Sequence, residues 1–313
     1  MKRFLLIAFL LSAPAWCGPQ RKAGSKKAAT AAVRAIPPDH ADLSYGPYSA
    51  NKLDLWLAKS DRPTPLVVFI HGGGFVGGDK RGVNARYLQQ CLNAGVSFAS
   101  IDYRFRPEVP IQTILRDSAR AIQFLRFHAD EFHIDKTKVG AYGGSAGAGT
   151  SLWLDFHDDL ADPKSADPVL RESTRLTAAG SVAGQASYDI LRWPEILGLN
   201  PNDIFRFISE QELLAFYGLR SMDELRGPRG AKIRADVDML SLITKDDAPV
   251  YLTASSDHDA LQTRGDVDHS AKHSIAIKHR CDEVGVPAVL RIGAGNAQTV
   301  GNPVAFLLEY LQR

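Results

Sequence analysis

Residues 143–147 (GGSAG) place a serine among small residues, directly after a short stretch at residues 138–142 that predicts a strand. The pattern G-x-S-x-G is typical of a sharp turn from a strand into a helix, where strained backbone angles and close packing require glycine. A serine at this turn is exposed above the sheet, and the amino end of the following helix favours developing negative charge. The pattern predicts that Ser145 is a nucleophile. The alternative is an ordinary serine in a glycine-rich turn.

A second glycine-rich motif, residues 71–75 (HGGGF), follows the continuous branched and aromatic stretch at residues 66–70, which is typical of a buried strand. Backbone N–H groups of such a loop can bind a developing oxyanion. We expect the amides of Gly73 and Gly74 to act together with that of Ala146, and the histidine that opens the loop to hold it in place. A phosphate-binding loop is the alternative, but the Lys-Ser/Thr ending of a P-loop is absent.

Alternating strands and helices surround these motifs. Apolar residues recur with period two or in short runs where strands are expected, and at helical spacing between them. The order predicts an α/β fold with a mostly parallel sheet and helices on both faces. Strands are expected at 51–58, 66–70, 96–102, 138–142, 249–254 and 289–292, and helices at 84–94, 111–128, 273–284 and 303–311.

Residues 155–236 break this alternation and predict a cap inserted over the sheet, although residues 178–184 within it have a weak strand pattern. A cap of this kind would shape the substrate pocket. Trp153, Trp193 and Phe216 could line that pocket, while aromatic side chains are more often packed in a core.

The motifs carry a resemblance to a known family. HGGG at 71–74, DYR with a following Pro-Glu at 102–108, and GGSAG at 143–147 resemble, in type and spacing, the hormone-sensitive-lipase group and the BD-FAE-like esterases of the α/β-hydrolase superfamily. The resemblance covers residues 53–154 well and the last third of the chain more loosely. It implies the α/β-hydrolase fold and hydrolysis of short acyl or carbohydrate esters, with no metal or organic cofactor.

A serine nucleophile on this fold is followed by an acid and then by a base. Asp257 comes directly after the strand expected at residues 249–254, where the family places its acid. We expect Asp257 to orient the base, with Asp259 as the alternative. Each could also be a solvated loop carboxylate.

The base is where the sequence departs from the family, whose histidine lies in the loop before the last helix. Gln298 stands nearest to that position, and no histidine occurs after His279. Glutamine cannot accept the serine proton at neutral pH. We prefer His269 as the base, because the loop expected at residues 265–270 leaves the carboxyl end of the late strand, where ligands bind in such sheets. His258 and an absent base are the alternatives.

The amino-terminal residues have the pattern of a secretory signal. Lys2 and Arg3 precede an apolar stretch at residues 4–11, and small residues at 13–15 suit a cleavage site. The apolar stretch is too short for a bilayer span, which needs about 20 residues. We expect a signal peptide at residues 1–17 and a secreted or periplasmic protein.

A flexible linker is expected at residues 18–38 and one α/β-hydrolase domain at residues 39–313. The chain of 313 residues is 45% hydrophobic and 23% charged, with a formal net charge of +2. This balance is globular and lacks the clustered basic excess of nucleic-acid-binding proteins, so we expect a small-molecule or carbohydrate ester as partner and no nucleic acid. Lipid attachment at Cys17 is disfavoured because the bulky Trp16 precedes it.

Three alternatives remain open at this stage. Cys91 and Cys281 lie in expected helices and are read as buried thiols, although a disulfide between them is possible in an oxidising compartment. The substitution at Gln298 motivates a catalytically degenerate hydrolase that binds a ligand or partner. A peptidase or acyl transferase on the same fold is also open, since fold does not determine substrate.

Overall fold

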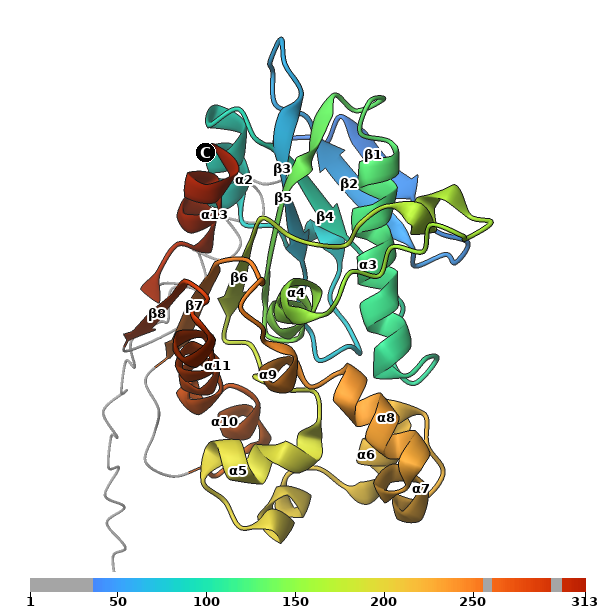
Figure 1. The fold of residues 1–313 in the computed structure, drawn as a ribbon, viewed down its shortest axis with the longest axis vertical. Helices are drawn as coiled ribbons and strands as arrows, with labels where there is room; N and C mark the ends of the chain where they lie inside the picture. Colours follow the sequence, from blue (N-terminus) through green and yellow to red (C-terminus); the bar gives the residue numbers. More distant parts are fainter. Residues whose placement is uncertain (1–35, 256–260, 294–299) are drawn as a thin grey trace, which may run out of the picture.

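The computed structural model describes residues 36–255, 261–293 and 300–313. An eight-stranded sheet forms its centre, in the order β1-β2-β4-β3-β5-β6-β7-β8 (Figure 1). The strands are β1 (His40–Ser44), β2 (Lys52–Trp56), β3 (Thr64–Ile70), β4 (Ser97–Ile101), β5 (Ile134–Gly144), β6 (Ala178–Val182), β7 (Val250–Ser255) and β8 (Ala288–Gly293).

The sheet is parallel from β4 through β3, β5, β6 and β7 to β8, and only β1 and β2 run antiparallel to their neighbours. The branched residues of β3 fit this position, because a central parallel strand is covered on both faces. The prediction of a mostly parallel sheet is therefore confirmed.

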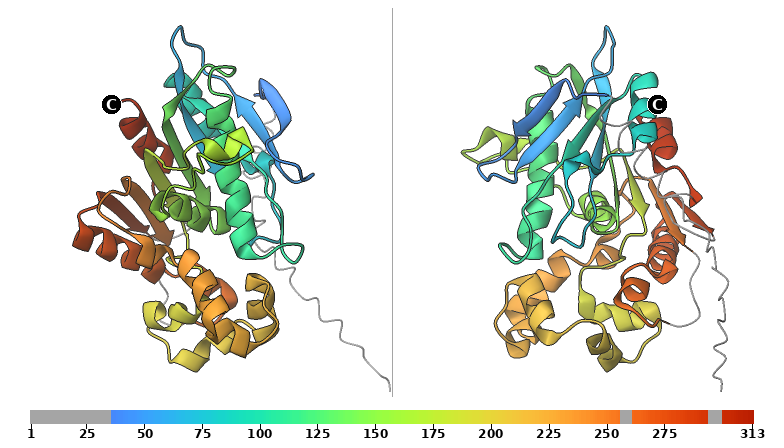
Figure 2. Two further views of the ribbon diagram at one scale, coloured as in Figure 1. Left: turned by 45° about the vertical axis from the view of Figure 1, so that its right-hand side comes forward. Right: turned by 180° about the vertical axis from the view of Figure 1, so that it is seen from behind.

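Helices cover both faces of the sheet (Figures 1 and 2). One face carries α3 (Ile111–Phe127), α4 (Ala146–Phe156) and α11 (Ala271–Val284), and the other carries α2 (Ala85–Asn93) and α13 (Pro303–Leu311). Each face buries its own apolar cluster against the sheet. The two layers place the carboxyl ends of the parallel strands at one edge, where the functional motifs lie.

A group of short helices lies beyond this edge, at the lower end of the molecule in Figure 1. Glycines in the left-handed conformation end two of them, and serine side chains cap the amino ends of two. The cap consists of η3 (Ile190–Arg192), α5 (Trp193–Leu197), η4 (Pro201–Arg206), α6 (Glu210–Tyr217), α7 (Met222–Arg226), α8 (Pro228–Asp236) and α9 (Met239–Leu242).

The bounds predicted for the cap, residues 155–236, need correction. They include β6, which is a fully buried central strand between β5 and β7. The sequence of β6, AAGSV, consists mostly of small residues and therefore has a weak strand pattern. The insertion that forms the cap lies instead between β6 and β7.

Two further elements differ from the prediction. The edge strand β1 was not predicted, because its sequence HADLS has little apolar periodicity. The loop expected at residues 265–270 contains the helix α10 (Arg264–Asp268). The signal peptide predicted at residues 1–17 and most of the linker at 18–38 lie outside the described residues. Among those that are described, no helix is both long and apolar enough to cross a membrane.

Candidate active site

Ser145 lies at the turn between β5 and α4, with φ 53° and ψ −119°. This conformation is strained for a residue with a side chain. Two glycines allow it, since a Cβ built on Gly147 would lie 2.0 Å from the carbonyl oxygen of Ile70, and one on Gly143 would lie 2.6 Å from the same atom. The amide of Ser145 also donates a hydrogen bond to the carbonyl of Val182 on β6 (2.9 Å). The predicted strand-to-helix turn is therefore present.

The glycine-rich loop after β3 packs directly against this turn. A Cβ on Gly72 would lie 2.5 Å from the carbonyl oxygen of Gly144, so the two backbones are in contact. Gly73 and Gly74 have φ values of +120° and +61°, a region that side chains rarely adopt. Gly73 and Ser145 line the same cavity. The loop thus carries Gly73 to the cavity at Ser145, while Gly74 is the next residue along the loop and is not among those that line the cavity.

Ala146, the third expected oxyanion-binding residue, is the first residue of α4. Its carbonyl accepts a hydrogen bond from the buried hydroxyl of Tyr188 (2.7 Å). The first amides of a helix have no acceptor within the helix itself. The amide of Ala146 is therefore available beside Ser145, at the end of the helix that favours negative charge.

His269 reaches the serine from the segment that follows β7. Its Nε2 atom lies 3.5 Å from Oγ of Ser145. This is the upper limit of a hydrogen bond, and such contacts are often long without substrate and tighten in its presence. The other ring nitrogen, Nδ1, is buried and finds no hydrogen-bond partner within the described ranges. The two side chains that the sequence pairs as nucleophile and base therefore lie together.

The other candidates for acid and base, Asp257, His258 and Asp259, lie outside the described residues, as does Gln298. Two further histidines of this part of the chain lie within the described residues. His273 is fully buried, where it accepts a hydrogen bond from the amide of Ala186 (3.3 Å) and its Nε2 lies 3.1 Å from the carbonyl of Val267. His279 is 76% exposed on α11 beside Glu283. Both positions are those of structural and surface histidines.

The helix α10 sets the position of His269, which is its C-terminal cap residue. The helix begins with a reciprocal capping box between Thr263 and Asp266. Gln185 donates a hydrogen bond to the carbonyl of Asp268 (2.6 Å), the residue before His269. The pattern T-x-x-D at residues 263–266 is a local signal of this helix, although a loop was predicted here.

Arg264 joins α10 to the cap. Its Nε atom lies 2.7 Å from the carboxylate of Asp268. Its Nη1 atom lies 3.1 Å from Glu212 on α6 and donates to the carbonyl of Phe207 at 3.3 Å. The guanidinium of Arg264 thus holds α10, the helix that ends at His269, against two segments of the cap. The sequence did not predict these contacts.

A cavity of about 480 Å³ opens at Ser145. None of its described lining residues comes from a cap helix, so packing in the core, the alternative given for the three aromatic residues, is what the structure supports. Trp153 and Trp193 are buried in the core, and Phe216 packs on Phe75 and Tyr188. The lining residues are Phe69, His71, Gly72, Gly73, Gly78, Asp79, Gly82, Asn84, Tyr87, Tyr142, Gly143, Gly144, Ser145, Val182, Ala183 and His269.

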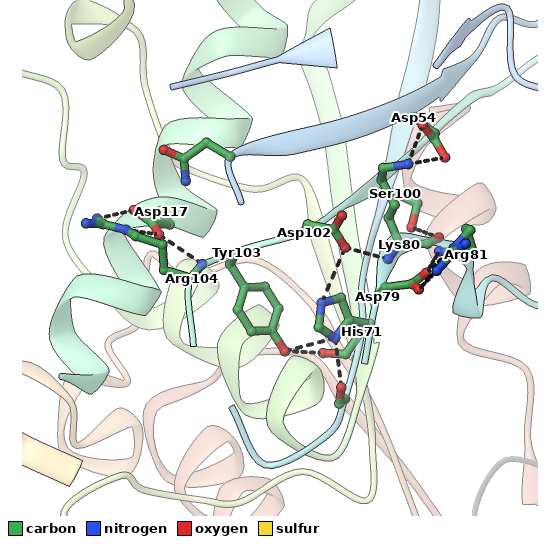
Figure 3. A network of polar contacts seen from close by, with 12 residues as sticks. Asp54, His71, Asp79, Lys80, Arg81, Ser100, Asp102, Tyr103, Arg104 and Asp117 are labelled. Carbon is green, nitrogen blue, oxygen red and sulfur yellow. Dashed lines mark hydrogen bonds and ion pairs between the residues drawn. The ribbon is translucent and has the colours of Figure 1, made fainter. Parts of the chain in front are cut away.

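A network of polar contacts holds the glycine-rich loop in place (Figure 3). The hydroxyl of Tyr103 donates to the carbonyl of His71 (2.6 Å), and the two rings stack at a centroid distance of 4.3 Å. The amide of Lys80 donates to Asp102 (2.6 Å), while its buried ammonium lies 2.8 Å from Asp54 on β2. These contacts attach both ends of the loop to the sheet.

Burial explains the charge states within this network. It lowers the pKa of His71, which is 3% exposed, and raises the pKa of Asp102 to about 6. The Nε2 atom of His71 lies 3.7 Å from Asp102, beyond hydrogen-bond distance, while its Nδ1 contacts the carbonyl of Gly72 (2.7 Å). A neutral His71 held by Tyr103 and Gly72 supports the loop, as the sequence analysis expected.

The two cysteines of the described chain are free and buried. Cys91 packs on α2 and Cys281 on α11, on opposite faces of the sheet, which excludes the disulfide left open above. Burial raises the pKa of each thiol to about 12, so neither is a thiolate at neutral pH. Within residues 36–255, 261–293 and 300–313, no three His, Cys, Asp or Glu side chains are grouped to hold a metal.

Part of the chain is similar in sequence to known esterases. Residues 53–169 match the family model BD-FAE. The chain is 39% identical over 89 residues to carboxylic ester hydrolase LipN of Mycobacterium tuberculosis, covering 28% of this chain and 24% of LipN. It is 32% identical over 83 residues to esterase LipI of the same organism, covering 26% of each. The chain thus spans about a quarter of the length of these curated relatives.

Solved structures share the fold over nearly the whole domain. A truncated carbohydrate esterase from gut microbiota has a TM-score of 0.68 at 16% identity, over 88% of this chain and 99% of that one. An acetyl ester-xyloside bifunctional hydrolase from Caldicellulosiruptor lactoaceticus has a TM-score of 0.61 at 19% identity, over 88% and 94%. With the strand order, these similarities show that the chain has the α/β-hydrolase fold, and residues 53–169 are similar to the BD-FAE family.

Proposed function

We propose that this chain hydrolyses carboxylic esters with Ser145 as its nucleophile. The observation that carries the proposal is the 3.5 Å distance between Ser145 Oγ and His269 Nε2 at a strained strand-to-helix turn. A serine hydroxyl is a weak nucleophile until a neighbouring base accepts its proton. Among the described residues, His269 is the side chain in position to do so.

The reaction would proceed in two halves. Ser145 Oγ attacks the ester carbonyl carbon while His269 takes the hydroxyl proton, and the amides of Gly73, Gly74 and Ala146 bind the resulting oxyanion. His269 then gives its proton to the departing alkoxide, leaving an acyl-serine. In the second half, His269 takes a proton from water, the hydroxide attacks the acyl carbon, and Ser145 regains its proton as the acid leaves.

Asp257 is our proposal for the acid that orients His269. Its support is its place in the sequence, two residues after β7, together with the buried Nδ1 atom of His269 that lacks an acceptor among the described residues. A carboxylate at Nδ1 would fix the tautomer in which Nε2 can accept the serine proton. None of these steps requires a metal or an organic cofactor.

The substrate class we propose is short acyl or carbohydrate esters. The support is the open cavity at Ser145, whose volume lies in the range of small-molecule sites, and the names of the relatives and of the carbohydrate esterases that share the fold. We also propose that the chain is exported, because residues 1–17 have the charged, apolar and small-residue pattern of a signal peptide.

A fluorophosphonate probe and an aryl acetate test this function. The chain without residues 1–17 should react covalently with the probe and hydrolyse 4-nitrophenyl acetate, and Ser145→Ala should abolish both. A wild-type rate equal to that of Ser145→Ala, with no probe attached, would reject the hydrolase and favour the catalytically degenerate binding protein. His258→Ala is the matched test of the alternative base and should retain most of the rate.

A further inference from the structure

Arg106 occupies the space between the glycine-rich loop and the cap. Its amide donates a hydrogen bond to the carbonyl of Phe75 (2.8 Å), and its Nη2 atom donates to the carbonyl of Gly74 (3.3 Å). Its guanidinium carbon lies 5.0 Å from the ring centroid of Phe216 on α6. The side chain is half-buried. A cation is therefore held over the loop that we propose binds the oxyanion.

No carboxylate of the described chain lies within ion-pair distance of this guanidinium, and its buried Nε atom has no hydrogen-bond partner there. Arg104, two residues earlier, provides the contrast, because it forms a paired contact with Asp117 at 2.6 Å. An unpaired charge taken partly out of water is costly. Burial accordingly lowers the pKa of Arg106, although an arginine stays protonated in proteins.

The nearest carboxylates are already occupied. Glu212 and Asp268 both influence the pKa of Arg106, but both side chains are bound by Arg264, at 3.1 Å and 2.7 Å. The positive charge of Arg264 also repels that of Arg106. Among the described residues, Arg106 is thus left with aromatic and carbonyl contacts. Its Nε is buried, so Nη1 and Nη2 carry the donors that suit a planar anion, which a guanidinium can bind through two parallel hydrogen bonds.

We propose that Arg106 binds a carboxylate carried by the ester substrate, on the cap side of the glycine-rich loop. This inference rests on the proposed ester hydrolysis and adds the preferred substrate class, an ester that bears a negative charge away from the scissile bond. Half-burial strengthens such a pair relative to a surface ion pair, because less water competes for the donors.

Two pairs of substrates matched in shape test the preference. Mono-4-nitrophenyl glutarate and 4-nitrophenyl valerate differ by a carboxylate on the acyl side, and 4-acetoxybenzoate and 4-acetoxybenzamide differ by one on the alcohol side. We expect the anionic substrate of at least one pair to have the higher kcat/KM, and Arg106→Gln to lower the anionic-to-neutral ratio by roughly tenfold, mainly through KM. Arg106→Lys should restore part of the ratio, and added salt should reduce it.

Arg229→Gln is the matched control, since Arg229 is 65% exposed and paired with Glu224, and neither residue lines the cavity at Ser145. It removes one positive charge and should leave the ratio within twofold of wild type. A ratio that Arg106→Gln leaves unchanged for both pairs, or an equal loss for anionic and neutral esters, would overturn the proposal and leave Arg106 a role in holding the loop.

A binding measurement separates this proposal from the proposed hydrolysis. Glutarate and 4-hydroxybenzoate can be titrated into Ser145→Ala and into the double variant Ser145→Ala, Arg106→Gln by calorimetry. Binding of at least one anion to the first and at least fivefold weaker binding to the second support the carboxylate site, even if the wild type hydrolyses none of the four esters. Equal affinity in the two variants, or binding to neither, contradicts it.

Discussion

Ser145 and His269 are 124 residues apart in the sequence, yet Oγ of the first lies 3.5 Å from Nε2 of the second. The histidine arrives from the segment between β7 and α11, after the short helix α10. This position differs from the loop after the last strand, where the related esterases are expected to carry their base. The contact supports the proposal that Ser145 is the nucleophile and His269 the base, although the sequence has Gln298 nearest to the place where the family's histidine is expected.

The tight packing around the serine predicts a strong effect of a single methyl group. Gly147→Ala places a Cβ against the backbone carbonyl of Ile70, which cannot move without displacing β3. We expect it to destabilise the protein by roughly 3 kcal/mol or more, measured by urea unfolding. Gly144→Ala is the control, because nothing lies within 4 Å of its added Cβ. Equal stability of the two variants would contradict the packing.

Arg264 should act on the rate through the position of His269. Arg264→Ala removes the ion pair with Asp268 within α10 and the contact of α10 with Glu212 on the cap. We expect kcat to fall by roughly tenfold, since small displacements of a catalytic group are costly, with a smaller change in KM. Arg229→Ala, which removes an exposed pair with Glu224 within the cap, should leave kcat within twofold. A loss confined to KM would argue against a positioning role.

The buried ion pair behind the glycine-rich loop predicts a loss of stability. Lys80→Met leaves the buried carboxylate of Asp54 without its partner. Removing one member of such a pair typically costs about 3–5 kcal/mol, which guanidinium unfolding would measure. The double variant Lys80→Met, Asp54→Leu should recover much of this loss. No recovery would mean that the penalty does not come from an unpaired charge.

Asp155 predicts a stabilising substitution with a defined pH dependence. The residue is 1% exposed on α4, and no cation of the described residues forms an ion pair with its carboxylate. Burial, and then the nearby Asp247, raise the pKa of Asp155 well above its ordinary value. Because the folded pKa is above the unfolded one, the wild type keeps its full stability below about pH 4 and loses part of it as the pH rises.

Asp155→Asn removes this ionisation and should be more stable than the wild type at pH 7, by on the order of 1–2 kcal/mol. The difference should disappear near pH 4. Asp246→Asn is the control, since Asp246 is 71% exposed. A stability difference that is the same at pH 4 and pH 8 would rule out the titration of Asp155 as its cause.

The local patterns predicted most of the sheet, because strands such as β3 and β7 are apolar runs with glycine or proline at their ends. They missed β1, and they gave β6 only a weak strand pattern within the expected cap. The strand β6 has only small residues and is defined by its neighbours β5 and β7, and β1 is an edge strand that pairs with β2 alone. Both depend on pairing that sequence periodicity does not contain.

The residues of the candidate site also divide into those that local sequence patterns predicted and those that they did not. The turn at Ser145 and the loop at Gly73 follow from local glycine patterns, and His269 from its place after a late strand. Arg106 and Arg264 could not be predicted, because their importance comes from which carboxylates lie near them once the cap is folded. The sequence left open for the same reason whether Trp153, Trp193 and Phe216 line a pocket or pack in the core, and the structure buries all three.

The pairing of Ser145 with His269 is tested most directly by single-turnover acylation with 4-nitrophenyl acetate. We expect His269→Ala to slow acylation by at least about a thousandfold, close to the loss in Ser145→Ala, because removing either member of such a unit removes its activity. His279→Ala, which alters an exposed histidine on α11, should acylate at the wild-type rate. Acylation of His269→Ala within twofold of wild type, with Ser145→Ala inactive, would show that another group activates the serine.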